Sequence, residues 1–252
     1  MLTILAWILK ELAWPYCIMV VMCFMYVKFS ALNKLSRSSS KQNVLFITAH
    51  PDDECMFFSP TILSLLREGH NIYLVCVTKG DYYGLGDIRR KELQASCTRL
   101  GIMPSHVTVI DDDRFKDGPE NVWDLDGLGE RILSVIKRVQ AESIITFDKH
   151  GVSGHTNHIS VYKAVDKLFQ DKQLNNINVF VLETTNIVRK YMSFFDIPCS
   201  SLFNMASFVS LPSEVIKTWQ AMAMHNSQMV WFRKLYIVFS RYIYVNTYKE
   251  LR

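Results

Sequence analysis

Residues 44–54 read V-L-F-I-T-A-H-P-D-D-E and join a buried strand to a cluster of ionisable side chains. The first five residues are apolar or β-branched, a pattern typical of a strand buried on both faces of a parallel sheet. A proline-containing turn then packs one histidine and three carboxylates into five residues. Because open α/β sheets bind ligands beyond the carboxyl ends of their strands, the pattern predicts a functional site in this turn.

The side chains of this turn are suited to a metal and to proton transfer. Imidazole and carboxylate groups are common metal ligands, so His50 and Asp53 are candidate ligands, with Asp52 left to handle a proton. The alternative is an acidic helix N-terminus, because three successive carboxylates suit a first helical turn. That alternative leaves the histidine unexplained. We interpret Glu54 as a residue that only starts the helix.

Strand and helix patterns alternate along the rest of the chain. Strands are predicted at residues 44–48, 72–78, 107–110, 143–147 and 177–182, and helices at about 56–68, 88–100, 126–140 and 155–169. Gly69 and Gly101 are placed to end the first two helices. This alternation predicts an α/β, Rossmann-like three-layer fold with a mostly parallel sheet.

A second cluster, D-K-H-G-V-S-G-H-T-N-H at residues 148–158, follows the fourth predicted strand. Both clusters are expected at one edge of the sheet, because parallel strands end on the same side. His155 and His158 are three residues apart on a predicted helix and share a face. The alternative is a polar helix start with surface histidines. His50, Asp53 and His158 together supply three nitrogen and oxygen ligands, which leaves a position for water as in hydrolytic zinc sites.

In such a site Asp52 is the natural general base, and a protonated His155 can stabilise an oxyanion or protonate a leaving amine. The chain has no G-x-S-x-G elbow, no G-x-x-x-x-G-K-[ST] loop and no G-x-G-x-x-G after the first strand. Gly84 and Gly86 complete no phosphate-binding fingerprint, and we interpret them as part of a mobile active-site loop.

Composition narrows the class of protein further. With 252 residues and 49% hydrophobic residues, the chain fits one large domain or a domain with an appendage. The net charge of +4 is mild and the basic residues are dispersed, so no nucleic-acid binding is predicted. The six cysteines form no disulfide-like pattern, which suits a reducing compartment.

Residues 12–27 carry no charge and predict a membrane-spanning anchor, extended by apolar residues before them or by the reach of Lys28 to the interface. A cleaved signal peptide is the alternative, but a basic n-region and a clear cleavage site are missing. Basic residues follow the segment, and no acidic residue occurs from residue 12 to residue 51. The positive-inside rule therefore predicts that the remainder faces the cytosol. We predict an anchor and linker over residues 1–41 and a catalytic domain over residues 42–252.

Near the end of the chain, residues 229–248 interleave aromatic side chains with Arg233, Lys234 and Arg241. Two interpretations stay open for this stretch. It is either a final strand or helix packed on the core, or an amphipathic element that lies on a membrane surface.

The motifs A-H-P-D-D-E and G-H-x-N-H, in this order, resemble the PIG-L/LmbE-like family of metal-dependent de-N-acetylases, and most of all its eukaryotic, lipid-specific branch. Further similar motifs are T-K-G-D-Y-Y at residues 78–83, R-R-K-E-L at 89–93, L-G-I at 100–102, T-F-D at 146–148, G-V-S-G-H at 151–155, R-K-Y at 189–191 and S-Q-M-V-W-F-R-K-L-Y at 227–236. The ordered set spans most of the chain, and the N-terminal anchor also matches.

The resemblance implies roles for individual residues. Those implied to bind a divalent metal, zinc above all, are His50, Asp53 and His158. Asp52 is implied to be the general base, and His155 to support the transition state.

Three further positions bear on the resemblance. Arg89 matches a family arginine near the substrate, with an exposed helix-start arginine as the alternative. Soluble bacterial relatives usually have aspartate and tyrosine where this chain has Asn157 and Ser153, so the hydrogen bonds around the neighbouring histidine are expected to differ.

The activity implied by the resemblance is removal of acetate from N-acetylglucosaminyl-phosphatidylinositol, giving glucosaminyl-phosphatidylinositol, an early step of glycosylphosphatidylinositol (GPI) anchor biosynthesis. The expected place is the endoplasmic reticulum membrane, with one span and a cytosolic catalytic domain. The expected partners are the sugar-lipid substrate and the membrane, with no nucleic acid and no protein partner predicted. The alternatives are a de-N-acetylase of a soluble N-acetylglucosamine conjugate and a non-catalytic, membrane-tethered protein that binds a sugar lipid.

Overall fold

The computed structural model describes residues 13, 17, 18, 21, 40–202 and 206–251. Apart from four positions, the predicted membrane anchor at residues 12–27 lies outside these residues, as does most of the linker. Among the described residues, no helix is both long enough and apolar enough to cross a bilayer. The division of the chain into residues 1–41 and 42–252 stays a prediction.

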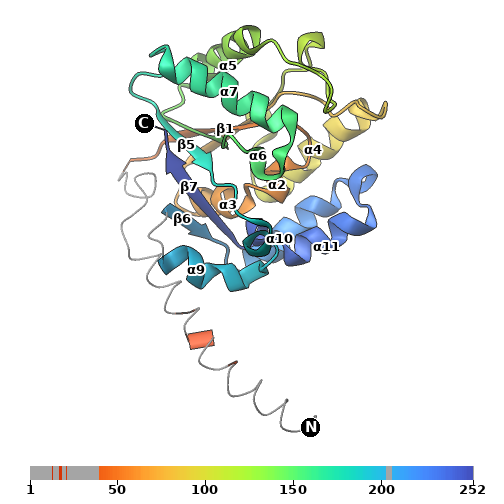
Figure 1. Cartoon of the computed structure of the whole chain (residues 1–252), viewed down its shortest axis with the longest axis vertical. Coiled ribbons are helices and arrows are strands. Elements are labelled where there is room, and N and C mark those ends of the chain that lie inside the picture. The colour runs from red at the N-terminus through yellow and green to blue at the C-terminus, as the bar shows by residue number, and fades with distance from the viewer. Residues whose placement is uncertain (1–12, 14–16, 19–20, 22–39, 203–205, 252) are drawn as a thin grey trace.

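The described chain contains one seven-stranded sheet in the order β3-β2-β1-β4-β5-β7-β6 (Figure 1). Its strands are β1 Asn43–Thr48, β2 Asn71–Cys76, β3 Val107–Val109, β4 Ser143–Phe147, β5 Asn178–Leu182, β6 Ala206–Val209 and β7 Val245–Glu250. The first five strands pair in parallel, whereas β7 runs antiparallel to both of its neighbours. The predicted α/β fold with a mostly parallel sheet is confirmed.

Helices cover both faces of this sheet (Figure 1). One face carries α2 Asp53–Met56, α3 Ser59–Arg67, α4 Gly86–Leu100 and α10 Pro212–Ala223, and the other carries α5 Leu125–Val139 and α7 Thr156–Gln170. Alternate residues of β1 divide between two cores, with Phe46 in the first and Ile47 in the second. This period of two explains why an uninterrupted apolar run folds as a strand buried on both faces.

The helix predicted over about residues 56–68 is confirmed as α3, which begins three residues later than expected because a separate short helix, α2, precedes it. α2 ends before Phe57, and α3 begins at Ser59 with Pro60 in its first turn. Proline lacks the N–H that would continue a preceding helix, so it marks a new start. The rings of Phe57 and Phe58 fill the core at the break, and each contacts Phe147 edge to face.

The remaining helices are α6 Gly151–Gly154, α8 Ile187–Lys190, α9 Asp196–Leu202 and α11 Trp231–Phe239. Of these, α9 lies beside β6 (Figure 1). The stretch at residues 229–248 divides between the two interpretations, because β7 is paired within the sheet while α11 exposes large apolar side chains. Contact of this stretch with a membrane stays a prediction.

Candidate active site

The turn after β1 fixes one carboxylate against the end of the strand. Oδ2 of Asp53 accepts hydrogen bonds from the backbone N–H groups of Ala49 (2.9 Å) and His50 (2.8 Å). Its other oxygen, Oδ1, lies 3.2 Å from Nε2 of His158 on α7. Because β1 and β4 are parallel neighbours, the two predicted clusters meet at one edge of the sheet, as expected.

The loop after β4 sets the orientation of His158. Nδ1 of this ring donates to the carbonyl oxygen of Gly151 at 3.1 Å, so in the neutral tautomer Nε2 carries the lone pair and faces the site. Phe147 stacks on the other side of the ring. Gly151 has φ +57°, and a Cβ there would lie 2.9 Å from the Cβ of His158, so glycine is required.

The donor set formed by His50, Asp53 and His158 fits a divalent metal. Nδ1 of His50 lies 3.3 Å from Nε2 of His158, so two ring nitrogens face each other beside a carboxylate. All three residues are buried. A cation between these atoms would bind both nitrogens and the carboxylate at once. Imidazole nitrogens and carboxylate oxygens are common ligands of zinc in proteins. A ring nitrogen of His155 lies within 4.8 Å of those of the other two histidines.

All six residues that the sequence assigned to the site line one cavity of about 370 Å³: His50, Asp52, Asp53, Arg89, His155 and His158. The structure thus brings the predicted set together, while the role of each residue stays a prediction.

Asp52 adopts an unusual backbone conformation with φ +107°. Its N–H donates to Oε2 of Glu54 at 3.0 Å, and Oε1 of that carboxylate accepts from Oγ of Ser96 (2.5 Å) and pairs with Nε2 of His225 (2.7 Å). The interpretation of Glu54 as a mere helix start is wrong, because the side chain is fully buried and holds the turn. Its partner His225 lies 171 positions away and gave no local signal in the sequence.

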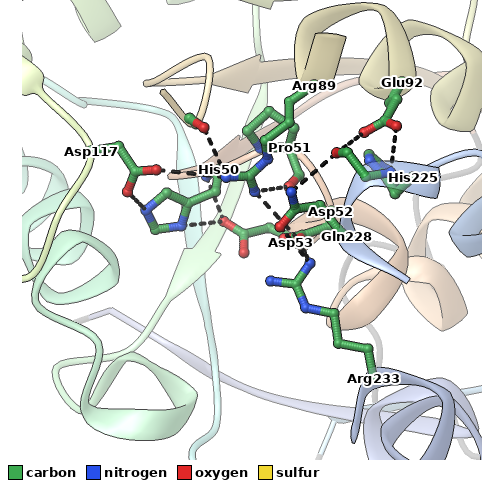
Figure 2. A network of polar contacts seen from close by, with 12 residues as sticks. His50, Pro51, Asp52, Asp53, Arg89, Glu92, Asp117, His225, Gln228 and Arg233 are labelled. Atoms are coloured by element: carbon green, nitrogen blue, oxygen red, sulfur yellow. Dashed lines mark hydrogen bonds and ion pairs between the residues drawn. The ribbon is translucent and has the colours of Figure 1, made fainter. Parts of the chain in front are cut away.

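Two guanidinium groups hold the carboxylate of Asp52 (Figure 2). Arg89 is buried and donates to the carbonyl oxygens of Pro51 (2.8 Å) and Gly80 (3.0 Å), with the Asp52 carboxylate 3.4 Å away. The alternative of an exposed arginine is therefore wrong, and the observed contacts are those of a positioning residue. Arg233, from α11, forms a second ion pair with Asp52. Sequence reasoning missed this residue, although its place in the aromatic-basic stretch was a signal.

Asp117 is another site residue that the sequence did not reveal. Its Oδ1 lies 3.1 Å from Nε2 of His50 (Figure 2). The two atoms form an ion pair when the ring is protonated, although their alignment does not meet the geometry of a hydrogen bond. Burial lowers the pKa of His50, but Asp117 and Asp53 raise it by more, so the net pKa lies above 6.5.

His155 sits just before α7 rather than inside it, and its ring is neutral at neutral pH. Nδ1 accepts from the backbone N–H of Asn157 at 3.3 Å, so Nε2 carries the proton. Burial, followed by repulsion from His50 and His158 when their rings are protonated, lowers the pKa of His155 to about 4. In the amide orientation that satisfies its neighbours, the buried side chain of Asn157 donates to the carbonyl oxygen of Gly118 (3.1 Å), next to Asp117.

The sheet, the donors at the strand ends and the adjacent carboxylate define the class of protein as a Rossmann-like α/β enzyme whose site residues are suited to a divalent metal and to proton transfer. Similarity to known proteins then identifies the family. A family model described as PIG-L, GlcNAc-PI de-N-acetylase, matches residues 45–169, which include both clusters.

Curated relatives and solved structures agree with this match. The chain is 43% identical over 205 residues to N-acetylglucosaminyl-phosphatidylinositol de-N-acetylase of Bos taurus, covering 81% of each chain. It is 37% identical over 243 residues to a probable enzyme of the same name from Dictyostelium discoideum, covering 84% of this chain and 94% of that one. The chain therefore belongs to the PIG-L family of de-N-acetylases, and the predicted resemblance is confirmed. The zinc-inhibited form of teicoplanin deacetylase Orf2 shares the fold, with a TM-score of 0.57 and 17% identity over 82% of this chain and 97% of that chain.

Proposed function

We propose that this chain hydrolyses the acetamide of N-acetylglucosaminyl-phosphatidylinositol, giving acetate and glucosaminyl-phosphatidylinositol, an early step of GPI-anchor biosynthesis. The observation that carries the proposal is the position of Asp52, whose carboxylate lines the same cavity as the three converging metal-type donors. The names of the 43% and 37% identical relatives supply the substrate class.

The residues proposed to hold a zinc ion are His50, Asp53 and His158. When bound, the ion would polarise the acetyl carbonyl and lower the pKa of water to roughly 7. The attacking water gives its proton to Asp52 as its oxygen adds to the carbonyl carbon. Arg89 and Arg233 hold this carboxylate from two sides, which fixes its direction before substrate arrives.

His155 acts through its neutral ring. As the carbonyl oxygen gains negative charge, Nε2–H of His155 donates a hydrogen bond to it. A protonated ring is not required, because a neutral imidazole with its proton on Nε2 already offers this donor. The C–N bond then breaks, and Asp52 returns the proton to the departing nitrogen, so that one carboxylate serves as base and then as acid.

We also propose that the catalytic domain works on the cytosolic face of the endoplasmic reticulum membrane, attached by the apolar segment at residues 12–27. Support comes from the basic residues that follow this segment and the absence of acids up to residue 51. Protease treatment of sealed microsomes should digest the domain at residues 42–252 without detergent. Protection of the domain in intact vesicles would contradict this orientation.

The activity is tested with the full chain, purified in detergent with zinc, on synthetic N-acetylglucosaminyl-phosphatidylinositol. Release of acetate and of a free sugar amine is expected, and Asp52→Asn should lower kcat by about 10³-fold. Asp113→Asn is the matched control, because this carboxylate is exposed outside the cavity. Hydrolysis of only a water-soluble conjugate would support the soluble-substrate alternative, and binding without acetate release would support the non-catalytic one.

A further inference from the structure

A second cavity of about 650 Å³ adjoins the catalytic cavity. Four residues line both spaces: Met56, Phe57, Ser153 and Arg233. The other walls come from the end of α8, with Lys190 and Tyr191, and from one side of α11. A ligand whose acetylated sugar occupies the catalytic cavity can therefore continue directly into the second one.

The walls of this cavity are mostly aromatic and aliphatic. α11 contributes Phe232, Leu235, Tyr236 and Phe239 to them. No acidic side chain lines the cavity, and its size falls in the range of small-molecule sites. The space therefore suits an apolar group that carries a negative charge.

Lys190 is a cationic residue of the cavity wall that can bind an anion. In the described part of the chain it forms no ion pair, and burial lowers its pKa. The two nearby guanidinium groups are already occupied, because Arg189 pairs with Asp196 at 2.7 Å and Arg233 pairs with Asp52. An anion that entered here would meet an ammonium group without a competing carboxylate.

The two helices that contribute walls to the cavity also expose large apolar side chains, and we call these exposed residues the apolar rim. Ile187 and Trp231 are each 73% exposed, and Leu235 is 50% exposed. These residues belong to α8 and α11, which contribute walls to the same cavity. The segments Ile187–Lys190 and Trp231–Phe239 contain no acid. An exposed apolar surface with cations and no acids is suited to an anionic lipid surface.

We propose that the second cavity is the subsite for the lipid end of the substrate. Lys190 binds the phosphodiester, the walls of α11 take the glycerol and the first carbons of an acyl chain, and the apolar rim meets the bilayer. The inference rests on the proposed function, and it names the part of the chain that would select a lipid-linked sugar over a free one.

The test compares three substrates of the full chain. They are N-acetylglucosaminyl-phosphatidylinositol with two octanoyl chains, kept below its micelle concentration, its deacylated glycerophosphate form, and N-acetylglucosaminyl-inositol without phosphate. The wild-type KM should be about tenfold lower for the octanoyl lipid than for the deacylated form. Leu235→Ser should reduce that preference to about threefold or less.

Lys190→Gln isolates the phosphodiester contact. In this variant, the KM for the deacylated glycerophosphate substrate divided by the KM for N-acetylglucosaminyl-inositol should rise about tenfold. The reason is that the charge-assisted hydrogen bond to the phosphate is lost. Lys234→Gln is the matched control, being an exposed lysine on α11 outside the cavity. It should leave this ratio unchanged. Equal KM values for acylated and deacylated substrates, or equal effects of the two lysine variants, would overturn the subsite.

A binding measurement separates this inference from the activity itself. Titration calorimetry with dioctanoyl phosphatidylinositol should show binding to the wild type and about tenfold weaker binding to Lys190→Gln. Binding of this kind without hydrolysis of any substrate would reject the proposed function and keep the subsite. Hydrolysis of all three substrates without lipid binding would reject the subsite alone.

Discussion

Oε1 of Glu54 lies 2.7 Å from Nε2 of His225, and both side chains are completely buried although 171 positions separate them. The pair reaches the reacting groups because Oε2 of Glu54 accepts the N–H of Asp52, whose φ of +107° costs about 1–2 kcal/mol. Burial opposes both charges, but mutual attraction outweighs it, lowering the pKa of Glu54 and raising that of His225. The buried ion pair thus holds the proposed general base in a strained turn.

Glu54→Gln should cost about 3 kcal/mol of unfolding free energy, because it leaves His225 buried without its counter-charge. Loss of the turn's anchor should also let Asp52 shift, lowering kcat by about 10- to 100-fold with a smaller change in KM. Urea denaturation and steady-state kinetics measure the two effects. Glu130→Gln, an exposed glutamate on α5, is the control. A variant with normal kcat would show that the pair only stabilises the fold.

Much of the site could be predicted from the sequence because its signals are local. A buried strand is an unbroken apolar run, and the two histidine-bearing turns each follow such a run directly. Parallel pairing of β1 and β4 then brings His50 and His158 together without further information. Pro60 was a visible signal for the break between α2 and α3, and the helical pattern on either side concealed it.

Other features could not be predicted because they depend on contacts between distant parts of the chain. Asp117 and His225 come from segments with no regular pattern that points to the site, and Arg233 reaches it only because α11 packs beside the turn after β1. Residues 229–248 stayed open between a packed strand or helix and a membrane-surface element, because Asn246 and Thr247 of β7 look solvent-exposed in the sequence. Both are fully buried, and the amide of Asn246 donates to the carbonyl oxygen of Phe57 at 2.9 Å.

The metal content of purified variants should distinguish the proposed metal ligands from the proposed general base. Asp53→Asn and His158→Ala should lose the ion and nearly all activity, whereas Asp52→Asn should keep the ion and lose turnover. Atomic absorption on the purified full chain measures the content. A chelator should inactivate the wild type, and zinc should restore it. Full metal content in His158→Ala would exclude His158 as a ligand.

Arg89→Lys should behave differently from the neighbouring change Arg90→Lys. The Arg89 guanidinium bridges two carbonyl oxygens and Asp52, a geometry that an ammonium group cannot reproduce. We expect a loss of about 1–2 kcal/mol in stability and about a tenfold fall in kcat. Arg90 is 46% exposed in its side chain and should tolerate lysine within about 0.5 kcal/mol. Equal stability and kcat in the two variants would remove Arg89 from its positioning role.

His155 should make the metal-free protein less stable as the pH falls from about 6.5 toward 4. Its pKa is about 4 when folded and near 6.5 when unfolded, so the unfolded chain binds more protons across this interval. The free energy of unfolding is therefore highest, as far as this ring is concerned, above pH 6.5, and it decreases as the pH falls toward 4. Glutamine cannot titrate, so the stability of His155→Gln should fall less than that of the wild type between pH 7.5 and pH 5. The difference between the two losses should be about 1 kcal/mol, after allowance for the partial exposure of the ring. Denaturant titrations of the chelated wild type and variant at both pH values measure the difference. Parallel losses in the two proteins would show that the ring is not held neutral by its surroundings.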